Sequence, residues 1–167
     1  VKGATEHLIH TSRSNMSTQN RTHEAVLALL SAADMAGLAQ VVGDDLGPML
    51  DVDVAGLAFE ECPIPIPALT VPVIQRLPAG SIDRIMGGPD HDCALNEQMP
   101  GDPAVFGAGA GLVSSSALVR LNPGGQCPPG LLALGSRHGR TFHSGQGTEL
   151  ITFLARVAAS CVRRFVG

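Results

Sequence analysis

Four cysteines are the side chains of this 167-residue chain best suited to redox or metal chemistry. They stand at positions 62, 93, 127 and 161, and none forms a CxxC pair, so neither a zinc ribbon nor a thioredoxin motif can be built locally. Cys161 falls on the apolar stripe of a predicted helix, where we expect it in the core. The other three fall in predicted loops, where a neighbour that lowers the thiol pKa would make them reactive.

A second dense group of potential ligands surrounds Cys93. His91, Asp92 and Cys93 are consecutive, and His138 and His143 could join them in space. A metal site needs three or four converging ligands, and this spacing does not enforce convergence. We therefore predict a polar loop here and no metal ion.

Other motifs lack the context that their chemistry needs. Residues 106–112, FGAGAGL, have glycines spaced as GxGxG without a following helix or a Walker lysine. Ser114–Ser116 lie in a strand pattern and not in a GxSxG elbow. The acidic pairs Asp44–Asp45 and Glu60–Glu61 are predicted to be solvated ends of elements. We predict no catalytic residue and no enzymatic activity.

Small residues precede the predicted last helix and could hold an anion at its first turn. Residues 144–148 read SGQGT, so Gln146 and Thr148 would offer donors, with Arg137 just upstream as an ionic partner. The simpler interpretation is a tight turn from strand to helix with Ser144 as N-cap.

Composition excludes several classes of protein. The formal net charge is −4, so the chain lacks the basic excess of nucleic-acid-binding proteins, and with no Trp or Tyr its five Phe are the only side chains on which bases could stack. No apolar run approaches the roughly 20 residues that span a bilayer, and the first residues have no signal-peptide core. We therefore expect no direct nucleic-acid or membrane binding, and a cytoplasmic location.

Hydrophobic periodicity places the helices. Loose helical spacing over 8–30 has too few apolar positions to bury itself on one chain, so we expect this helix to pack against a partner. A second helix is predicted over 34–50, with Ser31 or Asp34 as N-cap. The clearest helix begins near Gln146, with two adjacent apolar stripes.

Alternating patterns and turn residues place the strands. Predicted strands cover 51–61, 69–77, 111–122 and 129–138, the last two as an antiparallel hairpin, with 93–99 as the extended part of segment 89–111. Proline occupies three of the six positions in 62–67, which must therefore be a loop or a sheet edge. Residues 81–88 read as a short helix closed by two glycines. This order predicts an α+β fold, an antiparallel sheet with long N- and C-terminal helices packed on one face.

Three segments resemble the bacterial domain-of-unknown-function family 484, whose members have a GAF-like domain. The most specific is ALGSRHGRTFHSGQGTELITFL at 133–154, and the others are VIQRLP at 73–78 and NRTHEAVLALLSAADMAGL at 20–38. The resemblance implies a GAF-like domain preceded by a longer helical region, and the chain begins with Val1, so we expect it to be part of a longer protein. The family has no assigned activity. Its genes often neighbour those of tyrosine site-specific recombinases.

Two domains and a function follow as predictions from this resemblance. We expect residues 1–31 to end an N-terminal dimerisation helix and residues 32–167 to form the GAF-like domain. GAF-like domains are typically small-molecule sensors or dimerisation modules, which implies a non-enzymatic regulatory protein that forms a homodimer through its terminal helices. Alternatives are a thiol-dependent redox enzyme of GAF fold, and a ligand-free scaffold for a partner such as a site-specific recombinase.

A ligand pocket is predicted between segment 78–111 and the sheet face away from the long helices. No cofactor can be named from the sequence. The predicted ligand-binding residues are Phe59, Met86 and Phe106 as apolar lining, Gln75, Arg120 and Arg137 as polar contacts, and Gln146 and Thr148 at the start of the last helix.

Overall fold

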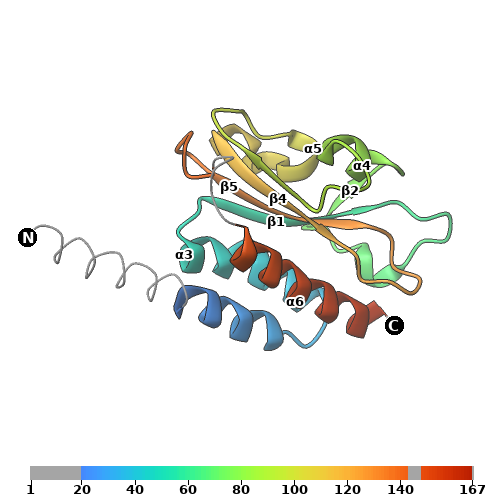
Figure 1. The fold of residues 1–167 in the computed structure, drawn as a ribbon. Helices are drawn as coiled ribbons and strands as arrows, with labels where there is room; N and C mark the ends of the chain where they lie inside the picture. The colour runs from blue at the N-terminus through green and yellow to red at the C-terminus, as the bar shows by residue number, and fades with distance from the viewer. Residues whose placement is uncertain (1–19, 143–147, 167) are drawn as a thin grey trace, which may run out of the picture.

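A mixed five-stranded sheet forms the centre of the protein (Figure 1). The computed structural model describes residues 20–142 and 148–166. The sheet order is β2-β1-β5-β4-β3. Long helices cover one face of the sheet and short helices cover the other, so the α+β fold predicted from the sequence is confirmed. The strands are β1 (Val54–Glu60), β2 (Gln75–Leu77), β3 (Cys93–Asn96), β4 (Ser115–Leu121) and β5 (Gly130–Ser136).

One strand pair departs from the antiparallel prediction. β1 pairs with β2 in parallel, while the β1–β5, β5–β4 and β4–β3 pairs are antiparallel. The predicted strand 69–77 is wrong over 69–74, where a 3-10 turn at Pro67–Leu69 and further turns replace it. Prolines remove the donors that a longer strand would need, so only the last three residues of the run pair with β1.

The helix on the 34–50 segment forms as predicted, with an irregularity in its middle. It consists of α2 (Met35–Gln40), a π-helical turn (Val41–Asp45) and α3 (Leu46–Leu50). Asp34 is its N-cap, accepting a hydrogen bond from the Gly37 amide at 2.7 Å. Beside it lies α6 (Glu149–Val166), which confirms the predicted C-terminal helix.

The helix at residues 20–30 buries part of its surface against its own chain. This corrects the expectation that its apolar residues are too few to pack without a partner. Ala25 and Leu29 are fully buried in the core beneath the long helices. The Cys161 thiol of α6 lies 3.7 Å from the Leu29 carbonyl. Residues 8–19 of the predicted helix lie outside the described residues, and the division into 1–31 and 32–167 stays a prediction.

The opposite face of the sheet carries a second core. Three short helices cover it, namely α4 (Ser81–Met86), α5 (Pro103–Phe106) and a 3-10 helix (Gly107–Leu112). α4 ends as predicted at Gly87, and Gly80 precedes its first residue; both glycines have a φ of +84°, which favours glycine. α5 was not predicted from the sequence, although Asp102 caps it by accepting from the Ala104 amide at 2.9 Å.

The central strand β5 is buried on both faces, so side chains packed on either face limit the size of its residues. Every residue of β5 is buried. At Gly130 an added Cβ would lie 2.5 Å from Cε1 of the Phe59 ring, and at Gly135 it would lie 2.6 Å from Cγ2 of Val113. These glycines let one side chain from each core approach the strand closely.

We expect Gly130→Ala to lower the free energy of unfolding by about 1–3 kcal/mol, because the buried Phe59 ring must shift. The matched control is Gly56→Ala in β1, where an added Cβ meets nothing within 4 Å. Urea denaturation measures both variants. Equal effects of the two substitutions would contradict the close packing of Phe59 on Gly130.

Candidate functional site

Two of the predicted pocket residues belong to the second core. Met86 is 5% exposed and Phe106 is 8% exposed, and both pack with residues of α4, α5, β4 and β5. The face on which the sequence predicted a ligand is therefore filled by protein side chains at these positions. Their role in the described structure is to hold α4 and α5 on the sheet.

The other apolar candidate lies on the opposite side of the sheet. Phe59 belongs to the core beneath the long helices and does not meet Met86 or Phe106. Gln75 lies close to α5, since a Cβ added at Gly107 would be 2.7 Å from its Nε2. The structure thus brings Gln75 toward Phe106 and separates both from Phe59.

Arg120 is a buried clamp between β4 and the segment that follows α4. Its Nη1 lies 2.7 Å from the Asp83 carboxylate, and its Nη2 donates to the Gly88 carbonyl at 2.9 Å. Nε and Nη2 also donate to the His91 carbonyl at 3.2 and 3.1 Å. With most of its N–H groups engaged, Arg120 joins the two elements rather than extending toward solvent.

We expect Arg120→Met to lower the free energy of unfolding by about 1–3 kcal/mol, because it removes the charged hydrogen bonds of a buried side chain to Asp83 and to the Gly88 and His91 carbonyls. Arg156→Met on the exposed side of α6 is the control, and its effect should stay within about 0.5 kcal/mol. Guanidinium denaturation compares the two variants. If Arg120→Met lowers the free energy of unfolding by no more than Arg156→Met does, Arg120 does not hold the segment after α4 on β4.

The remaining predicted residues lie at the far end of β5. The Arg137 amide donates to Asp53 Oδ2 at 2.7 Å, and its Nε lies 3.9 Å from Oδ1 of the same carboxylate. The Thr148 carbonyl accepts the Thr152 amide at 2.9 Å, in the first turn of α6. Ser144 and Gln146 lie outside the described residues. Arg137 thus already has a carboxylate partner, and the predicted anion site stays a prediction.

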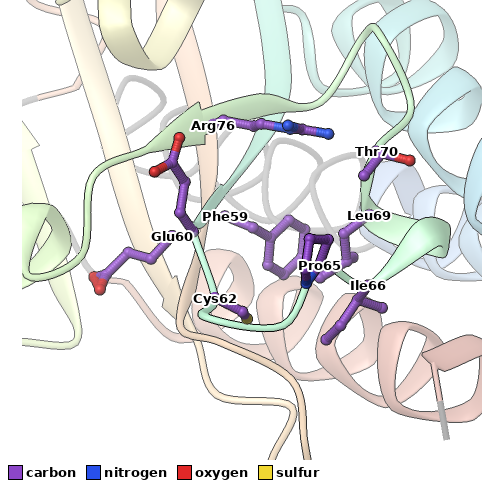
Figure 2. A pocket seen from close by; sticks show the side chains of 9 residues that line it. Phe59, Glu60, Cys62, Pro65, Ile66, Leu69, Thr70 and Arg76 are labelled. Carbon is purple, nitrogen blue, oxygen red and sulfur yellow. The ribbon is translucent and has the colours of Figure 1, made fainter.

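A pocket of about 250 Å³ lies instead at the end of β1 (Figure 2). The Phe59 ring lies beside Pro65 and Leu69, with Cys62 on the turn after β1 and Arg76 above the ring. The proline-rich loop 62–67 forms much of the wall. The lining residues are Phe59, Glu60, Glu61, Cys62, Pro65, Ile66, Leu69, Thr70 and Arg76.

Two polar side chains of this pocket, Glu60 and Thr70, already have partners within the fold, and the Thr70 hydroxyl donates to the Pro67 carbonyl at 2.7 Å. The Glu60 carboxylate accepts from the Gly80 amide at 2.7 Å and the Ile82 amide at 3.2 Å, so it caps α4 from β1. Glu61, Cys62 and Arg76 are the polar side chains left over for a ligand. An apolar wall beside a carboxylate and a guanidinium suits a small amphiphilic molecule. The sequence predicted that Phe59 lines a pocket but not that the loop residues do. The run of three prolines in residues 62–67 was the feature that could have indicated a fixed loop there.

Burial disfavours the thiolate form of three of the cysteines, namely Cys93, Cys127 and Cys161. Burial raises the pKa of Cys93, and burial also raises the pKa of Cys161 against the opposing charge of Arg164. The pKa of Cys127 is raised to about 11, mainly by burial and to a lesser extent by the charge of Cys62. The positive charge of Arg163 lowers it. A raised pKa lowers the thiolate fraction at neutral pH, so these three thiols lack the activation of a catalytic cysteine.

We expect the alkylation rate of Cys127 by iodoacetamide to rise about tenfold per pH unit from pH 8 to 10, because only the thiolate reacts. In the urea-unfolded chain the rate should level off above an ordinary thiol pKa of about 8.5. Mass spectrometry of the tryptic peptide 121–137 measures both rates. A native rate that levels off below pH 9 would contradict the raised pKa.

The predicted polar loop at 91–93 forms no metal cluster in the described part of the chain. Across residues 20–142 and 148–166, no three His, Cys, Asp or Glu side chains are placed to hold a metal ion. His143, the second of the two histidines that could join this group, lies outside these ranges. In the same ranges no helix is long and apolar enough to cross a membrane.

An exposed apolar strip follows the two terminal helices. Leu27 and Leu30 of helix 20–30 are 57% and 49% exposed, and Leu150 and Phe153 of α6 are 38% and 52% exposed. Leu150, Phe153 and half-buried Val157 share the flank of α6 that faces helix 20–30, since Leu150 and Thr22 line a common pocket. We call Leu27, Leu30, Leu150, Phe153 and Val157 the terminal-helix strip.

The family model described as "Protein of unknown function, DUF484" matches residues 74–167, which is more than half of the chain. The chain belongs to this family. The matched range of the DUF484 family runs from Ile74 through α6 and includes the 133–154 segment, the most specific carrier of the resemblance. No curated protein matches the chain. The family description assigns no activity.

Proposed function

We propose that this DUF484 protein is a non-enzymatic dimerisation module with a GAF-like fold, in which two copies pack through their terminal helices. The observation that carries the proposal is the terminal-helix strip. Four of the eight large hydrophobic side chains that are exposed among the described residues lie on helix 20–30 and α6. Such a concentration of exposed apolar side chains is typical of a protein–protein contact.

The charges along α6 favour a second copy as the occupant of this strip. Glu149 in the first turn of α6 and Arg164 in its last turn lie on the same side of the helix as Phe153, because they are four and eleven residues from it. They are 15 residues apart, or about 22 Å along a helix. If two copies of α6 pack antiparallel about a two-fold axis, each Glu149 faces an Arg164 of the other copy. The two charged ends of this side of α6 are therefore complementary in an antiparallel pair.

We expect Phe153→Arg to weaken dimerisation at least about 30-fold in Kd, because it places a charge at the centre of the apolar contact. The control is Leu112→Arg on the opposite side of the protein, where Leu112 is 46% exposed. Sedimentation equilibrium measures both. A monomer at every concentration, or a dimer broken only by the control, would overturn the proposal.

A charge exchange tests the antiparallel arrangement. Glu149→Arg and Arg164→Glu should each weaken the dimer by about tenfold, because each replaces two attractive pairs by repulsive ones in a two-fold contact. The double exchange should restore most of the affinity. Circular dichroism of each variant verifies that α6 remains folded.

Ligand sensing is the second candidate function, and the Phe59 pocket favours it. Phe59 and Leu69 line this pocket and belong to the same core as Leu154 and Ala158 of α6. A molecule bound there would contact side chains that support the dimerisation helix. Native mass spectrometry of the purified protein reports the dimer and any retained molecule together. A dimer without extra mass would favour the scaffold for a protein partner.

A further inference from the structure

We propose that Cys62 and Cys127 are a redox modification site, a dithiol that a low-molecular-weight disulfide converts to an intrachain disulfide. Cys62 follows β1 and Cys127 precedes β5, and these strands are antiparallel neighbours. Both thiols are free and half-buried. The proposal is independent of dimerisation, because neither cysteine lies on the terminal helices.

The register of the β1–β5 ladder carries the inference. Val54 pairs with Gly135 and Phe59 with Gly130, and the Glu60 amide still donates to the Pro129 carbonyl at 3.0 Å. The ladder ends there, and continuing its register two residues further would place Cys62 opposite Cys127. Paired residues on antiparallel strands have Cα atoms about 4.5–5.5 Å apart, which lies within the range that a disulfide spans.

The surroundings of the two sulfur atoms agree with this register. A negative charge on Cys62 raises the pKa of Cys127, as expected for thiols that lie close together. The other two cysteines are elsewhere. Cys93 pairs with Val119 at the β3 edge of the sheet, and Cys161 contacts the Leu29 carbonyl beneath helix 20–30.

The reaction is a pair of thiol–disulfide exchanges. The Cys62 thiolate attacks one sulfur of glutathione disulfide, forms a mixed disulfide and releases one glutathione thiolate. The Cys127 thiol then loses its proton, and its sulfur attacks Sγ of Cys62 and expels the second glutathione. Two protein thiols are oxidised and one glutathione disulfide is reduced to two glutathione molecules. Capping of Cys62 also removes the negative charge that opposes ionisation of Cys127.

The disulfide would fix the loop after β1 to the loop before β5. The first loop forms the wall of the Phe59 pocket and includes Cys62 itself (Figure 2). The second loop is tied to α6, because the Arg163 Nη1 donates to the Pro123 carbonyl at 3.2 Å. Oxidation would therefore connect the pocket wall to the C-terminal end of the helix layer.

The test is incubation of the full chain with glutathione disulfide, followed by acid quenching, alkylation of free thiols and non-reducing trypsin digestion. The four cysteines fall in four different tryptic peptides, namely 22–76, 85–120, 121–137 and 157–163. We expect peptide 22–76 to be linked to 121–137, with a loss of about 2 Da from the sum of their masses. Dithiothreitol should separate them again.

Single variants give the matched controls. Cys93→Ser should leave the yield of the 22–76 to 121–137 link unchanged. Cys127→Ser should abolish the link and leave glutathione attached to Cys62, as expected if the Cys62 thiolate reacts with glutathione disulfide and Cys127 then resolves the mixed disulfide. Links that involve Cys93, or glutathione adducts on both Cys62 and Cys127 without a link, would overturn the proposal, since either result requires that the two sulfur atoms do not meet.

Discussion

The position of β5, covered on both faces, is the constraint on which the rest of the structure depends. Its residues Gly130–Ser136 are all buried, and it pairs with β1 on one side and β4 on the other. Each face of this ladder must therefore be covered by an apolar layer. The long helices supply one layer and α4 with α5 supply the other. The ends of the ladder fix where the Phe59 pocket and the two loop cysteines lie.

Much of this arrangement could be predicted because its causes are local. Asp34 caps its helix through an amide three residues away, and Gly80 and Gly87 bound α4 with the backbone conformation that glycine adopts most easily. The alternating runs that became β4 and β5 and the helical stripe of α6 are also properties of short windows. These elements and their types thus follow from neighbouring residues, whereas α5 and the shortening of β2 and β3 do not.

What the sequence could not provide depends on residues far apart in the chain. The hydrogen bonds of Arg120 reach Asp83, Gly88 and His91, about 30 positions upstream, so an arginine that looked available for a ligand is occupied within the fold. Met86 and Phe106 are apolar residues in an irregular stretch of sequence, as pocket-lining residues often are. In the structure they are buried in the core because α4 and α5 pack on the sheet. The parallel β1–β2 pair arises because the proline-rich loop after β1 turns the chain back, so that β2 runs alongside the last three residues of β1, Ala58–Glu60, in the same direction. The proposed proximity of Cys62 and Cys127 likewise follows from the register of the β1–β5 ladder and not from their spacing in the sequence.

The edge strands are short, and this limits how the protein can associate with other chains. β2 has three residues and β3 has four, while the strands between them have seven each. A short edge presents few free backbone groups to an incoming strand, so addition of strands from another molecule gains few hydrogen bonds. Extension of the sheet into a larger, fibre-like assembly is disfavoured in the same way. Association is directed away from the backbone edges and toward side-chain surfaces, where contacts can be specific and reversible.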